Sequence, residues 1–179
     1  GVAQRSARER DRMHRFIVVV ALILALSPMT VHSLEVPSMI QLSAHCPGAE
    51  PCRFNGERLE IELVVHNSGD EPIQFPVDYY LNRGPVVKLV DNHSGKERSL
   101  SRGPSNLALM EKMQQLQPGQ SVRIPCEIFA ADIERFALRP IDLNAVLSVT
   151  PTPALPVSQL QMHSIQLRIV DGRPGFVSP

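Results

Sequence analysis

Apolar and polar residues alternate with a period of two along much of this chain. The clearest alternation runs from Leu59 to His66, where every second residue is apolar, and residues 143–149 and 165–169 repeat the pattern. Because successive side chains of a strand point to opposite faces of a sheet, these segments are predicted to be strands with one face on a core and the other in water. Less regular strands are expected at residues 38–44, 72–75, 86–90 and 121–129.

Turn sequences separate the predicted strands. Asn, Asp, Gly and Pro, which adopt a positive φ or preset the bend of a turn, gather at residues 67–70, 91–95 and 117–120. The chain is therefore expected to reverse direction repeatedly without helical crossovers. The sequence predicts an all-β domain, an antiparallel β-sandwich of about seven strands with one short helix in a connection.

That helix is expected to begin after Ser105 or Asn106, because either side chain can accept hydrogen bonds from the first backbone N–H groups of a helix. Apolar residues then recur at helical spacing, and their methionines are interpreted as core residues rather than ligands of a soft metal. These residues are Leu107, Met110, Met113 and Leu116. A second short helix or irregular turn is expected at residues 130–137, and an extended proline-rich loop at residues 151–156.

An apolar run near the start of the chain has the pattern of an export signal. The eleven residues 16–26 contain no polar side chain, basic residues precede them, and small residues follow. These are the parts of a secretory signal peptide, and the run is shorter than the roughly 20 apolar residues with which a helix spans a bilayer comfortably. The cut is expected after Ser33, and Met13 is interpreted as the true start. An uncleaved signal anchor and a buried core element are the alternatives.

The predicted domain boundaries follow from this interpretation. Residues 1–33 are assigned to the leader and signal peptide, residues 34–171 to the sandwich, and residues 172–179 to a loose C-terminal tail. The protein is expected to be periplasmic or secreted. It would then meet a membrane only through the signal segment, before cleavage.

The distribution of charge argues against a nucleic-acid partner. The chain has 18 basic and 18 acidic residues, and five of the basic and two of the acidic ones precede residue 16, which leaves 13 basic and 16 acidic residues in the remainder. There is no Trp, and there are only 2 Tyr. Because nucleic-acid binders are expected to have a basic face with stacking aromatics, this class is excluded.

The three cysteines suit an exported protein. Cys46 and Cys52 enclose residues 47–51, whose Pro and Gly residues favour bringing the two ends together, and we pair these cysteines in a disulfide. Cys126 falls on the apolar face of the strand expected at residues 121–129 and is predicted to be a buried thiol. The alternatives are a bridge from Cys126 to one of the other two, or an exposed thiol that forms a covalent dimer.

Three turn segments give the chain a resemblance to a known class of domain. Residues 67–72 (Asn-Ser-Gly-Asp-Glu-Pro) follow a strand, residues 93–96 (His-Ser-Gly-Lys) suit a hairpin, and residues 116–120 (Leu-Gln-Pro-Gly-Gln) lead into the next strand. In this order they resemble the immunoglobulin-like modules of many exported bacterial proteins, over residues 57–170. The resemblance implies an immunoglobulin-like antiparallel β-sandwich that works as an interaction, scaffold or inhibitor domain. The chain lacks the central Trp and the widely spaced core cysteines of antibody domains.

Motifs of catalytic, metal or cofactor sites are missing from the sequence. It contains no Gly-x-Ser-x-Gly, no His-Glu-x-x-His and no glycine-rich phosphate loop. His45, His66, His93 and His163 are interpreted as surface or hydrogen-bonded residues rather than metal ligands. We therefore expect no cofactor and no enzymatic activity, with a hydrolase built on a composite site as the more distant alternative.

One segment has the composition of a binding site. Aromatic residues and arginine are favoured at binding hot spots, and residues 75–83 combine them with both tyrosines of the chain. The candidate binding loop comprises Phe75, Asp78, Tyr79, Tyr80 and Arg83. The alternative is that its aromatics fill the end of the sandwich. We expect an exported module that binds another protein or a cell-envelope component.

A protease inhibitor is the main alternative function. The loop at residues 47–51, clamped by the predicted disulfide, would be the rigid element presented to a protease active site.

Overall fold

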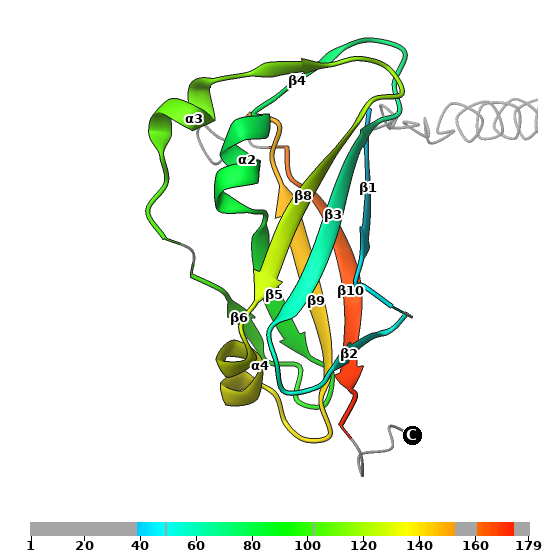
Figure 1. Ribbon diagram of the computed structural model, residues 1–179, viewed down its shortest axis with the longest axis vertical. Coiled ribbons are helices and arrows are strands. Elements are labelled where there is room, and N and C mark those ends of the chain that lie inside the picture. Colours follow the sequence, from blue (N-terminus) through cyan, green and yellow to red (C-terminus); the bar gives the residue numbers. More distant parts are fainter. Residues whose placement is uncertain (1–38, 49, 102, 153–160, 174–179) are drawn as a thin grey trace, which may run out of the picture. The chain divides into compact units, whose positions relative to one another are not determined.

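A computed structural model describes residues 39–48, 50–101, 103–152 and 161–173 (Figure 1). The strands are β1 Ile40–His45, β2 Cys52–Phe54, β3 Leu59–Asn67, β4 Ile73–Phe75, β5 Val86–Asp91, β6 Glu97–Ser99, β7 Gln114–Leu116, β8 Ser121–Ile128, β9 Asp142–Val149 and β10 His163–Asp171. The helices are α2 Val77–Arg83, α3 Leu107–Glu111 and α4 Ala130–Phe136. The predicted signal segment, the cut after Ser33 and the start at Met13 lie outside the described residues, as does most of the proline-rich loop.

The strands form three open sheets. Their orders are β1-β3-β8, β2-β10-β9-β5-β6 and β4-β7. Neighbouring strands are antiparallel except β2 and β10, which run parallel and so depart from the antiparallel expectation. The expectation of about seven strands omits β2, β6 and β7, each of 3 residues. Alternation cannot be recognised in so short a segment.

Alternation places one face of each long strand in a common apolar core. Every second side chain is buried over residues 59–65 of β3 and over residues 143–149 of β9. In β10, Leu167 and Ile169 are buried, whereas Ile165 is half-buried at the edge of the core. The three strands expected from regular alternation are thus confirmed, and β1, β4, β5 and β8 confirm the less regular ones.

The helices confirm one prediction and correct another. The short helix expected at residues 130–137 is α4. The short helix expected to contain Leu107 to Leu116 ends at Glu111 as α3, and none of its residues is buried. Asn106 occupies its N-cap position without a side-chain capping bond. Leu116 instead pairs with Ile73 across β7 and β4 and is buried there, so strand pairing overrides the helical spacing. Among the described residues, no helix is long and apolar enough to cross a membrane.

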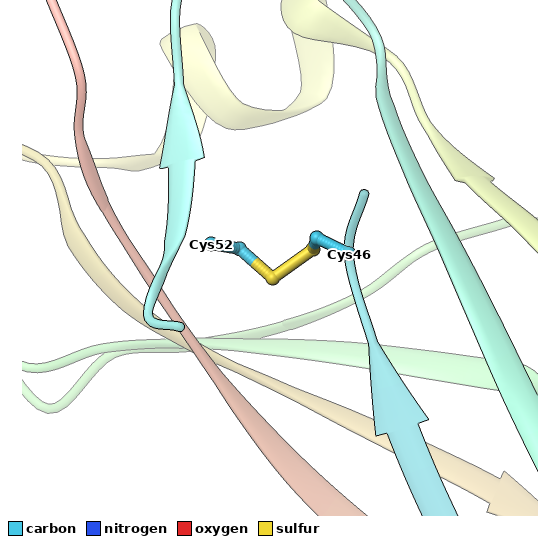
Figure 2. Close-up of a disulfide and its surroundings, with 2 residues drawn as sticks. All are labelled: Cys46 and Cys52. Atoms are coloured by element: carbon cyan, nitrogen blue, oxygen red, sulfur yellow. A yellow bond between two sulfur atoms is a disulfide. The ribbon is translucent and has the colours of Figure 1, made fainter. Parts of the chain in front are cut away.

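A disulfide links the two larger sheets. Cys46, which follows β1, is bonded to Cys52, the first residue of β2, with 5.7 Å between the Cα atoms (Figure 2). This confirms the predicted pairing and ties a strand of the three-stranded sheet to an edge strand of the five-stranded sheet. Cys126 is buried on the same face of β8 as Ile124 and Ile128, as expected.

The end of β10 is fastened by a buried carboxylate. Asp171 accepts hydrogen bonds from Arg173 Nε at 2.9 Å and Nη2 at 2.8 Å, and from the Ile141 N–H at 3.3 Å. The Arg173 guanidinium also lies 5.4 Å from the ring centre of Phe54 and 3.4 Å from Glu134 of α4. Arg173 belongs to the segment expected to be a loose tail, and it takes part in this described network.

The Asp171 network makes stability depend on acid pH. Hydrogen bonding to Arg173 lowers the pKa of Asp171 from 3.8 to about 2. Because the pKa is lower in the folded state, the stabilisation is complete above the unfolded pKa and is lost as the pH falls from about 4 to about 2. We expect the free energy of unfolding to drop by about 2 kcal/mol over this range through this group alone, measured by denaturant titration at each pH.

Asp171→Asn should remove most of this fall in the free energy of unfolding between about pH 4 and about pH 2. Asp70→Asn is the control, because Asp70 is exposed, and it should leave the fall in place. If the free energy of unfolding of Asp171→Asn fell as steeply as that of the wild type, Asp171 would not be the group responsible.

Candidate functional site

The segment predicted to be a binding loop is a helix. Residues 77–83 form α2, with Pro76 before it, Asp78 in its first turn and Arg83 in its last. These charges suit the helix dipole. Gly84 ends the helix at φ +73°, a conformation that favours glycine, and its N–H bonds to the Tyr80 carbonyl. The acidic first turn, the basic last turn and the following glycine are sequence signals of a helix at residues 77–83.

The aromatic residues of this segment lie inside the protein. Phe75 and Tyr80 have exposed fractions of 0% and 2%, and Tyr79 of 8%. The Phe75 and Tyr80 rings stack at 5.1 Å, and Tyr79 meets Tyr80 edge-on at the same distance. This arrangement matches the alternative in which these aromatics fill the end of the core.

The hydroxyl of Tyr80 joins α2 to the end of β9. It donates to the carbonyl of Thr150 at 3.1 Å and accepts from the Thr150 N–H at 2.7 Å. Burial raises the pKa of Tyr80 above its usual value. The hydroxyl therefore satisfies two buried backbone groups and stays protonated.

The polar residues of the predicted site hold the connection between β6 and β7. Asp78 accepts a hydrogen bond from Lys112, and another from Gln114 Nε2 at 2.7 Å; the Lys112 bond is the larger reason that the pKa of Asp78 is lowered. Arg83 Nη1 donates to the Gly103 carbonyl at 2.6 Å. Both side chains thus fasten residues 103–114 against α2.

Arg83 also borders a surface pocket of about 400 Å³. The pocket lies between the end of α2, the connection after β6, the end of β8 and the start of α4. Its lining residues are Asn82, Arg83, Leu100, Ser101, Gly103, Pro104, Glu127, Phe129 and Asp132. We call it the Phe129 pocket. Of the residues predicted to form the site, Arg83 alone lines it.

Phe129 is the distinguishing residue of this pocket. Its exposed fraction is 60%, and within the described residues no other aromatic side chain is so exposed. Two carboxylates share the pocket, and each is paired with an arginine of this chain: Glu127 lies 3.5 Å from Arg58, and Asp132 lies 3.3 Å from Arg98. An exposed aromatic ring in one pocket with an arginine, Arg83, has the composition of a binding hot spot.

The alternation of β8 is a sequence signal for the exposure of Phe129. In the alternation of β8, Ile124, Cys126 and Ile128 face inward, so position 129 falls on the outward face. A single exposed apolar residue is common on protein surfaces, so the signal is that aromatic residues are enriched at binding interfaces.

A second pocket, of about 440 Å³, lies on the outer face of the three-stranded sheet. Glu62 is one of its lining residues and lies 3.1 Å from His45 and 3.3 Å from Arg123. These ion pairs are exposed and contribute little to stability. In the part of the chain that the structure describes, no group of three His, Cys, Asp or Glu residues is placed to hold a metal.

Comparisons with known proteins assign no family. No protein-family model matches the sequence, and no curated protein matches it at a significant level. Among solved structures, it is similar to the Northeast Structural Genomics Consortium target SoR45, with a TM-score of 0.40 and 11% identity over 79% of this chain and 92% of that chain.

The chain is also similar to a part of two β-glucosidases. One, from Listeria innocua in complex with glucose, has a TM-score of 0.34 and 14% identity over 78% of this chain and 17% of that chain. The other, from Erythrobacter marinus, has a TM-score of 0.32 and 17% identity over 73% of this chain and 16% of that chain. The likeness is one of a β-rich fold.

A conservative substitution tests the structural role of Tyr80. Tyr80→Phe is expected to lower the free energy of unfolding by about 1–3 kcal/mol, because it leaves the buried Thr150 N–H without its partner. Tyr79→Phe is the matched control, since the structure describes no hydrogen bond for the Tyr79 hydroxyl; its effect should be under about 0.5 kcal/mol. Urea denaturation measures both, and equal effects would refute the distinction.

Proposed function

We propose that this protein is an exported, immunoglobulin-like β-sandwich module that binds another protein or a cell-envelope component through the Phe129 pocket. The observation that carries the binding role is the exposure of the Phe129 ring beside Arg83 and two carboxylates.

The strand order supports the immunoglobulin-like assignment. If β1, β3 and β8 are taken as strands A, B and E, the three-stranded sheet has the order A-B-E. If β5, β6, β9 and β10 are taken as C, C′, F and G, the other sheet contains G-F-C-C′. These are the neighbours found in immunoglobulin sandwiches of the variable type. Within the described residues, no strand occupies the D position beside β8.

Two independent features support export. The apolar run at residues 16–26 has basic residues before it and small residues after it, in the manner of a secretory signal. The Cys46–Cys52 disulfide is of a kind that persists in oxidising compartments such as the periplasm and the extracellular medium.

Affinity capture with matched variants tests the proposed pocket. The oxidised protein is used as bait against envelope and secreted fractions, and Phe129→Ser is expected to lower retention of the partner by roughly tenfold or more, as truncating a hot-spot aromatic does. Leu138→Ser is the control, because Leu138 is also exposed, at 54%, but does not line the pocket.

A partner retained equally by the wild type and by Phe129→Ser would overturn the pocket assignment. No partner specific to the wild type in either fraction would overturn the binding function itself.

A protease inhibitor is the second candidate function. Pro47, Gly48 and Glu50 are exposed, and the disulfide that closes their loop is buried at both cysteines. A short exposed loop on a rigid clamp can enter a protease active site at a low entropic cost.

Reduction of the disulfide tests the inhibitor role. We expect the oxidised protein to inhibit at least one member of a panel of extracellular proteases and the reduced protein to inhibit it less, because the opened loop regains conformational freedom. Residual protease activity against a peptide substrate is the measurement. Absence of inhibition in the oxidised state would remove this candidate.

A further inference from the structure

We propose that the outer edge of β8 receives an extended segment of a partner protein as an added strand, with a Lys or Arg of that segment lying beside Glu127 and Phe129. The inference rests on the proposed function and specifies the chemistry of the partner. Three observations carry it: the direction of the β8 backbone groups, the position of Pro125, and the charges of the Phe129 pocket.

The direction of the backbone groups follows from the turn beside β8. The Asn67 N–H bonds to the Gln120 carbonyl at 3.0 Å, and its carbonyl accepts from the Gly119 N–H at 2.9 Å, so the Asn67 backbone faces the β8 side. Ser68, one residue on, bonds instead to Met39 beside β1. The direction of the backbone N–H and C=O groups alternates along a strand, so those of Ile61, six residues before Asn67, also point toward β8. Cys126 is the partner of Ile61, and its backbone groups point toward β3.

The neighbouring residues of β8 therefore direct their backbone groups to the outer edge. These residues are Arg123, Pro125 and Glu127. β8 is an edge strand of its sheet, and no described residue outside β3 is hydrogen-bonded to the backbone of these three. Such an edge is a template for a further strand.

Pro125 divides this edge. A proline in a strand is tolerated where its missing N–H would face away from the neighbouring strand, which agrees with the outward direction deduced for position 125. The half of the edge before Pro125 is thereby blocked for continuous pairing. The half after it, at Glu127, keeps both its N–H and its carbonyl and opens into the Phe129 pocket.

The pocket selects for a basic side chain in the added strand. A residue directly opposite Glu127 would have its side chain on the same face of the sheet, beside the Glu127 carboxylate and diagonal to the Phe129 ring. A Lys or Arg at this position would gain an ion pair and a cation–π contact. Arg83 already donates to the Gly103 carbonyl, and Asp132 is paired with Arg98. Glu127 is paired with Arg58 at 3.5 Å, but both of these side chains are about half exposed, so a Lys or Arg of the added strand would join or replace Arg58 at the Glu127 carboxylate.

Proline substitution isolates the backbone contribution. The probes are peptides selected from a random 12-residue phage library against the oxidised protein. Glu127→Gln keeps the N–H but removes the charge, and should weaken peptide binding a few-fold. Glu127→Pro removes both, and should weaken it roughly a further fivefold to tenfold through the lost hydrogen bond. Arg123→Pro is the control. The backbone groups of Arg123 also point to the outer edge, but Arg123 lies on the other side of Pro125, so this variant should leave binding unchanged.

Amide hydrogen exchange provides a readout that needs no variant. Peptide binding is expected to protect the Glu127 N–H and to leave the Cys126 N–H, which already faces β3, unaffected. Selected peptides should also be enriched in Lys or Arg, and their binding should weaken in high salt.

Any of three results would overturn the inference: the library yields no peptide that binds the protein, the peptides bind Glu127→Pro as tightly as Glu127→Gln, or peptide binding gives the Glu127 N–H no protection from exchange. If a partner is nevertheless captured through Phe129, the proposed function stands and strand addition alone is rejected.

Discussion

A single apolar core, shared by the inward faces of both larger sheets, requires every second residue of the long strands to face inward. This constraint fixes more than the core. In β8 it places Ile124, Cys126 and Ile128 inward, and it follows that Glu127 and Phe129 belong to the outward series. A shift of one residue would exchange the two faces, burying a carboxylate and exposing the isoleucines. The surface chemistry near α4 is therefore a consequence of the same register that forms the core.

The end of the core is closed by α2 rather than by a strand. Phe75 and Tyr80 stack there, and the Tyr80 hydroxyl satisfies the backbone of Thr150, where β9 ends. Because a buried unpaired N–H is costly, this bond fixes α2 relative to the five-stranded sheet. Asp78 and Arg83 then attach the connection that follows β6, and that connection forms one wall of the Phe129 pocket. The buried aromatics thus act on the candidate site indirectly, by positioning its wall.

Sequence patterns predicted the long strands and the disulfide because these depend on local features. The alternation along β3 and β9 and the Pro and Gly residues between Cys46 and Cys52 can be recognised without knowing any tertiary neighbour. The extent of α3 could not be predicted in this way, since the pairing of β7 with β4 decides it. The pocket was missed for the same reason: its lining residues come from four segments, and composition alone cannot distinguish the buried Tyr80 from the exposed Phe129.

The edge of β8 combines protection from aggregation with a place for recognition. An open edge of eight residues would pair with any extended chain, and natural proteins interrupt such edges with proline or charge. Pro125 does this at the middle of the strand, and the charged residues Arg123 and Glu127 flank it on the outward face. What remains is a short segment that offers too few backbone bonds to hold an arbitrary strand. Binding at this segment therefore also requires side-chain contacts, which the residues of the Phe129 pocket can make. Because Pro125 limits the backbone hydrogen bonds, the proposed recognition depends on the side chains of the partner and hence on its sequence.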